Sequence, residues 1–213
     1  MQFLNSSRVV AALVSLSALP AMAMLPEWMA WENQPIENLQ VLVLFSGMII
    51  AGAFQIRGDE QWKWFWRVVT PVWLILCARE LSWGAAFYPP TKMTEVGPFF
   101  ASRALWYRPV VYPMVGLIIA AMCYMILRYR TWQKMPEIMR GGAMPWLECG
   151  LVVAALLVSI SAEGHGGPLS ALIPNSLVLE ETAELAAYCW LLVAQFRVRE
   201  FQLSNNALIS SKA

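Results

Sequence analysis

The sequence is poor in the residues that build most catalytic and metal sites. Its 213 residues include one His, and Asp59 is its single Asp. A Ser-His-Asp triad, a bis-histidine haem site and a structural zinc site each need more such residues than the chain supplies. The four Cys form no Cys-x-x-Cys pair, so the usual signature of disulfide-exchange enzymes is missing too. The sequence therefore leans away from an enzyme. A metal-dependent hydrolase acting at the outer membrane surface is the enzymatic alternative that stays open.

Charge is also scarce. Charged residues make up 14% of the chain and hydrophobic residues 59%, with a mean hydropathy of +0.53. A soluble domain carries about 25% charged residues, so this composition predicts a membrane protein whose first partner is the lipid bilayer. The formal net charge of +1 argues against nucleic acid as a partner, because phosphate binding needs clustered excess Lys and Arg.

The N-terminus resembles a secretory signal. Residues 1–8 end in Arg8, residues 9–19 are apolar, and Pro20 precedes Ala21-Met22-Ala23. This small-x-small pattern predicts a signal peptide over residues 1–23, followed by a single transmembrane helical domain over residues 24–213. The alternative is an uncleaved helix that runs to about Leu25 and is interrupted by Pro20.

Five further apolar stretches are long enough to cross a hydrocarbon core about 30 Å thick. The fold class is accordingly all-α, a polytopic transmembrane helical bundle with five spans after signal removal, or six if the first segment is kept. The five stretches cover residues 36–56, 68–87, 109–127, 144–163 and 176–196.

The Lys and Arg residues predict the orientation. Segments 57–67, 128–140 and 197–213 hold three, four and three of them, whereas 24–35, 88–108 and 164–175 hold none, three and none. By the positive-inside rule the first set is cytoplasmic. We therefore expect a cell inner-membrane protein with its mature N-terminus outside and its C-terminus in the cytoplasm.

The last stretch carries three glutamates, Glu180, Glu181 and Glu184. At about 100° per residue they fall within one arc of roughly 100°, which also includes Tyr188. Ionisable groups at membrane depth cost roughly 2.5–3.5 kcal/mol each and are rarely there without a partner or a task. The sequence thus predicts one polar helix face with a functional site on it.

Other helices add acids at a similar depth. With a rise of ~1.5 Å per residue, Glu80 and Glu184 both come about 12 Å below the outer surface. These acids predict a polar layer in the outer half of the bundle. Its remaining members are Glu163 and His165 near the outer surface, and Ser159 on the polar face of its helix. Glu148 lies on that face as well, but near the inner surface, where we expect water to solvate it.

The acids of this layer outnumber their partners. Arg79 is the one cation within the predicted bundle, and we expect it to pair with a carboxylate on another helix. The excess acids have to bind protons, bind a cation or open to water. The first hypothesis is therefore a cation or metal site, with a divalent ion as the possible cofactor.

Two alternatives stay open. One is a small proton- or cation-coupled transporter, in which Glu148 hints at a route that continues inward. The other is a non-catalytic assembly subunit, in which the polar layer is a structural staple and the aromatic outer segments meet a membrane-protein partner or a second copy of the chain.

Overall fold

The computed structural model describes residues 2–58, 60–94, 97–163 and 175–210. These residues are mostly helical, which confirms the all-α class. The helices are α1 (Gln2–Met24), α2 (Pro35–Arg57), α3 (Glu60–Glu80), α4 (Arg108–Arg128), α5 (Lys134–Arg140), α6 (Trp146–Ala162) and α7 (Ser176–Ser210). Short 3-10 helices are η1 (Glu27–Ala30), η2 (Ser82–Phe87), η3 (Ser102–Ala104) and η4 (Thr131–Gln133), and strands β1 (Lys92–Thr94) and β2 (Gly97–Phe99) pair antiparallel.

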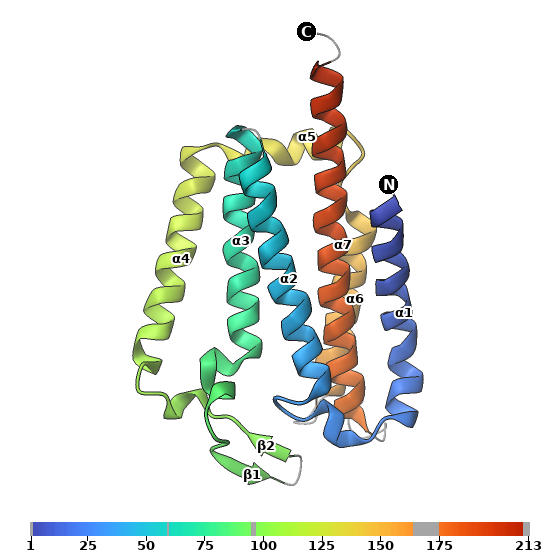
Figure 1. Ribbon diagram of the computed structural model, residues 1–213, viewed down its shortest axis with the longest axis vertical. Helices are drawn as coiled ribbons and strands as arrows, with labels where there is room; N and C mark the ends of the chain where they lie inside the picture. Colours follow the sequence, from blue (N-terminus) through green and yellow to red (C-terminus); the bar gives the residue numbers. More distant parts are fainter. Residues whose placement is uncertain (1, 59, 95–96, 164–174, 211–213) are drawn as a thin grey trace.

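The long helices lie side by side in a bundle built around α7 (Figure 1). Helix α7 packs against α1, α2 and α6, while α2 also packs against α3, and α3 against α4. The β1–β2 hairpin, η1 and the start of α7 lie at one end, which we name the hairpin end. The opposite end carries α5, the start of α1 and the end of α7, and we name it the α5 end.

The core between α2, α3 and α7 is built on tryptophan. Trp73 is 2% exposed, and its ring lies against Gly47, where an added Cβ would come within 2.6 Å of it. Its indole nitrogen donates to Gln195 at 2.5 Å, and the Gln195 amide donates to the Gly47 carbonyl at 3.2 Å. A polar group on each helix is thus satisfied inside an apolar core.

The predicted helix boundaries hold for two elements. Helices α2 and α4 each lie within one residue of the predicted stretches 36–56 and 109–127. Helix α6 is somewhat shorter than the predicted 144–163, and α7 continues as a helix to Ser210, well beyond residue 196. Part of the predicted inner tail therefore extends α7.

The boundaries predicted for the stretch 68–87 are wrong at both ends. Helix α3 starts eight residues earlier, at Glu60, because Trp62 and Trp66 stand four residues apart and bury one helix face, while the residues around them are polar or partly exposed. It ends at Glu80, before a turn in which Ser82, Trp83 and Gly84 all have positive φ. Glu80 is therefore the last residue of α3 and does not lie inside a longer helix, while its depth of about 12 Å below the outer surface stays a prediction.

The predicted signal segment forms helix α1, which continues through Pro20 to Met24. The interruption expected at Pro20 does not occur. Leu4 and Ala11 are buried against Trp190 and Val193 of α7. Helix α1 thus occupies a packed position beside α7.

Among the described residues, three helical stretches are long and apolar enough to cross a membrane: Leu4–Met24, Glu27–Arg57 and Arg108–Arg128. Helix α6 is apolar but shorter, with 17 residues. This supports a membrane protein, while the number of five spans stays a prediction.

Candidate functional site

A left-handed turn sets the position of Glu80 at the hairpin end. Ser82 and Trp83 adopt φ values of 47° and 59°, which are uncommon for residues other than glycine. Gly84 follows with φ of 96°, and an added Cβ there would meet the Tyr107 hydroxyl at 2.5 Å. That hydroxyl donates to the Trp83 carbonyl at 3.0 Å and so holds the turn. The turn ends α3 directly after Arg79 and Glu80.

Arg79 joins the two carboxylates that the sequence placed at one level. Its guanidinium lies 3.2 Å from Glu80 Oε1 and 3.4 Å from Glu184 Oε2 on α7. Glu80 also accepts a hydrogen bond from the buried Tyr188 hydroxyl at 2.6 Å, and Glu184 accepts one from Ser159 at 3.0 Å. The expected cross-helix pairing of Arg79 is present, and it includes the neighbouring Glu80 as well. We call these five residues the Arg79 network.

A second group of acids lies beside this network. Glu181 accepts a hydrogen bond from the amide of the buried Gln40 at 2.8 Å, and Glu37 accepts one from the backbone N–H of Asn33. Glu37 and Glu181 are close enough to Glu80 and Glu184 for their charges to interact. Arg79 contacts two of these four carboxylates, and the printed partners of Glu37 and Glu181 are neutral donors. Negative charge is therefore in excess among the described residues here.

Of these four acids, Glu181 lines a pocket of about 750 Å³ at the hairpin end. Among the described residues, glutamates contribute most of its charged lining, and Lys92 is the cation that lines it. Trp31 and Phe99 supply aromatic surface, and the Lys92 ammonium lies 5.0 Å from the centre of the Phe99 ring. The lining glutamates are Glu27, Glu32, Glu163, Glu180 and Glu181. We call this cavity the acidic pocket.

The structure brings most of the predicted site residues together, in two groups. Glu80, Glu184, Arg79, Tyr188 and Ser159 form the Arg79 network, whereas Glu163, Glu180 and Glu181 line the acidic pocket. His165 lies outside the described residues.

The predicted outer segment 88–108 holds two further cations, Arg103 and Arg108, which lie away from the acidic pocket. Arg108 stacks on Tyr112, with its guanidinium 4.1 Å from the ring centre, and lines a separate hollow together with Arg103 and Trp106. Lys92 is therefore the cation that the outer loop contributes to the acidic pocket.

Sequence reasoning missed four polar residues of this region: Glu27, Glu32, Glu37 and Gln40. Glu32 accepts a hydrogen bond from the Phe100 backbone N–H at 2.6 Å, which ties the segment before α2 to the end of the hairpin. A signal was available, because residues 24–35 hold two Glu without any Lys or Arg, and Gln40 interrupts an apolar helix. Acids without nearby cations, next to a predicted acidic layer, indicate membership of that layer.

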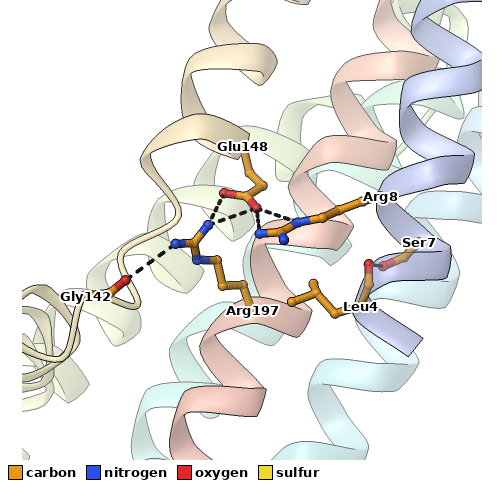
Figure 2. A network of polar contacts seen from close by, with 6 residues as sticks. All are labelled: Leu4, Ser7, Arg8, Gly142, Glu148 and Arg197. Atoms are coloured by element: carbon orange, nitrogen blue, oxygen red, sulfur yellow. Dashed lines mark hydrogen bonds and ion pairs between the residues drawn. The ribbon is translucent and has the colours of Figure 1, made fainter. Parts of the chain in front are cut away.

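At the α5 end, Glu148 is not solvated as predicted. It is fully buried and is enclosed by two arginines from other helices (Figure 2). Arg8 of α1 donates to its Oε1 at 2.5 and 3.1 Å, and Arg197 of α7 donates to both carboxylate oxygens at 3.2–3.3 Å. These partners lie 140 and 49 residues away in the sequence. The local sequence pattern could not show them, and the prediction that water solvates Glu148 is therefore wrong.

The described residues contain no group of three His, Cys, Asp or Glu side chains placed to hold a metal ion. The carboxylates of the acidic pocket are therefore too widely spread to form a compact ligand set among themselves. Their arrangement suits a larger or hydrated cation that fills a cavity, or protons that neutralise individual groups.

Comparisons of the chain with protein families, with curated proteins and with solved structures found no match.

Proposed function

We propose that this chain is a polytopic inner-membrane protein that binds a cation, or protons, in the acidic pocket. The observation that carries the proposal is the lining of that cavity of about 750 Å³, to which the described residues contribute five glutamates and one lysine. Carboxylates that share a site repel one another, and a bound cation or proton relieves this repulsion.

The size and lining of the pocket indicate the kind of cation. Cavities of roughly 300–1,000 Å³ hold small molecules, so a bare metal ion would leave most of this space empty. Trp31 adds aromatic surface, which attracts cations such as substituted ammonium groups, and the Phe99 ring already carries the Lys92 ammonium. A hydrated metal ion and a small organic cation both fit this chemistry.

The Arg79 network supports the pocket without being its ligand-binding part. Arg79, Tyr188 and Ser159 already occupy oxygens of Glu80 and Glu184. These contacts join α3, α6 and α7, and Glu184 lies on the same helix as the pocket residues Glu180 and Glu181. The staple hypothesis therefore describes this network, and the cation hypothesis describes the pocket beside it.

The distribution of charge supports an outward-facing pocket. The segments rich in Lys and Arg lie toward the α5 end, and the pocket lies at the opposite end of the bundle. By the positive-inside rule, we propose that the α5 end is cytoplasmic and the hairpin end external. Transport is the weaker proposal, because Glu148, its suggested inward step, is enclosed by two arginines.

A thermal-shift titration tests the proposal. The full chain, purified in detergent, is heated in increasing NaCl, CaCl₂ or tetramethylammonium chloride at constant ionic strength. A ligand at ten times its Kd adds about 1.4 kcal/mol of stability, which corresponds to roughly 3–5 °C in a chain of this size. We expect at least one probe to give a saturable rise of this order.

The test protein for this titration is a double variant that carries both Glu180→Gln and Glu181→Gln, so that two charges of the pocket are removed. Glu60→Gln is the matched control, because Glu60 is exposed at the α5 end. The proposal expects the saturable rise to be lost in the double variant and kept in the control. Equal rises of the melting temperature in all three proteins would refute the proposal. It would also be refuted if none of the three salts raised the melting temperature of the wild type, and if the melting temperature depended on pH in the same way in the wild type and the double variant.

A specific observation also favours an assembly subunit. Two large aromatic side chains at the hairpin end are highly exposed, with Trp106 at 84% and Phe87 at 76%. Large exposed aromatic side chains are enriched at protein interfaces. If two copies of the chain meet here, native mass spectrometry should detect a dimer that Trp106→Ala with Phe87→Ala abolishes and that Leu42→Ala on α2 keeps. A monomeric wild-type chain would contradict this second proposal.

A further inference from the structure

The surroundings of Glu148 bear on the fate of the N-terminal segment. Two arginines neutralise its buried carboxylate, and Figure 2 shows them approaching from different helices. Arg8 makes the shortest contact, at 2.5 Å, and belongs to the segment that the sequence assigned to a cleaved signal. Removal of that segment would take away one of the two counter-charges of a buried acid, which is costly.

Contacts along the whole of α1 point the same way. Near its middle, the Trp190 indole donates to the Ser15 hydroxyl at 2.9 Å, and Ala11 is fully buried. Near its end, the Asn175 amide donates to the Met22 carbonyl at 3.2 Å. The peptide bond after Ala23, where cleavage was expected, lies inside the helix. These contacts bind α1 to α7 and to Asn175, the residue directly before α7.

We propose that α1 is a permanent helix of the mature protein and that Arg8 is the fixed counter-charge of Glu148. The inference does not depend on cation binding at the hairpin end. It makes the bundle a set of six long helices, α1, α2, α3, α4, α6 and α7. Six crossings would bring both ends of the chain to the same side, in agreement with the start of α1 and the end of α7, which both lie at the α5 end.

The intact mass of the wild-type chain tests retention. The chain is expressed with a C-terminal tag, purified from membranes and analysed by mass spectrometry. A mass that includes residues 1–23 is expected. A mature chain that begins after Ala23 overturns the proposal, and this result needs no variant that might fail to fold.

A double-mutant cycle tests the role of Arg8. We expect Arg8→Gln to lower the melting temperature clearly, and to have little effect when Glu148→Gln is already present. Arg140→Gln is the control, because Arg140 is an exposed cation at the same end of the bundle. If Arg8→Gln has no larger effect than Arg140→Gln, or the same effect with and without Glu148→Gln, Arg8 is not the counter-charge.

Discussion

At the scale of single residues, the two ends of the bundle treat buried acids differently. At the α5 end, one glutamate, Glu148, meets two arginines, so its charge is fully compensated. At the hairpin end, Glu80 and Glu184 share one arginine, and Glu37 and Glu181 lie close by. The first arrangement holds helices together, whereas the second leaves a negative charge that a ligand can neutralise.

Tyr188→Phe tests the Arg79 network. The substitution removes the hydroxyl that donates to Glu80 at 2.6 Å and leaves a buried carboxylate with one partner fewer. Hydrogen bonds to charged groups contribute about 1.5–3 kcal/mol, so the free energy of unfolding should fall by that amount. Denaturant unfolding in detergent measures it. Tyr124→Phe is the control, since Tyr124 is exposed on α4, and an equal loss there would contradict the role given to Tyr188.

Glu148→Gln should separate stability from ligand binding. The loss of a buried acid with two cationic partners is expected to lower the free energy of unfolding by about 3 kcal/mol. Cation binding at the other end of the bundle should be unchanged, whereas Glu184→Gln should weaken it by disturbing the Arg79 network beside the pocket. Denaturant unfolding and the salt titration of the melting temperature measure the two effects. The reverse ranking for binding would place the functional site at the α5 end.

At the scale of elements, the close approach of α2 and α3 depends on Gly47. Its missing side chain leaves room for the Trp73 ring, which in turn reaches Gln195 on α7. Three helices are therefore joined through one glycine. The same region supports Glu80 at the end of α3.

Gly47→Ala tests this contact. The new Cβ would lie 2.6 Å from the ring of Trp73, so the helices must move apart, at a typical cost of about 1–3 kcal/mol for an overpacked core. Gly116→Ala on α4 is the matched control, because nothing lies within 4 Å of its added Cβ. Thermal unfolding of the two variants should differ in this direction. Equal stability would show that the α2–α3 spacing is not set by Gly47.

The elements also show what sequence patterns can predict. Long apolar runs bounded by charge gave α2 and α4 to within one residue, because such runs have one stable local structure. The start of α3 was misplaced because its first turns mix Trp with charged residues. Its end was misplaced because Ser82 and Trp83 adopt a left-handed conformation, which a sequence normally signals with glycine. The polar helix faces predicted the acid layer, but pairs such as Arg8 with Glu148 depend on tertiary packing.

At the scale of the whole molecule, positive and negative charge are concentrated at opposite ends of the bundle. Cationic segments gather toward the α5 end, while the acidic pocket and the exposed aromatics Trp106 and Phe87 lie at the hairpin end. By the positive-inside rule, this asymmetry is the basis of the proposal that the pocket opens to the outside.

Reporter fusions test the orientation. A reporter fused after Ala213 should be active only in the cytoplasm, and one inserted in the segment 164–175 only outside, because ten of the fifteen Lys and Arg fall in the three predicted inner segments. Reversed activities would turn the acidic pocket toward the cytoplasm and contradict the proposed direction of access.

Isothermal titration of the detergent-purified full chain with the salt that stabilises it most is the most direct test of cation binding in the acidic pocket. We expect one saturable binding event per chain in the wild type and in Glu60→Gln, and its loss in the double variant Glu180→Gln with Glu181→Gln. Binding of the same affinity and stoichiometry in all three proteins would contradict the assignment of the site to this pocket.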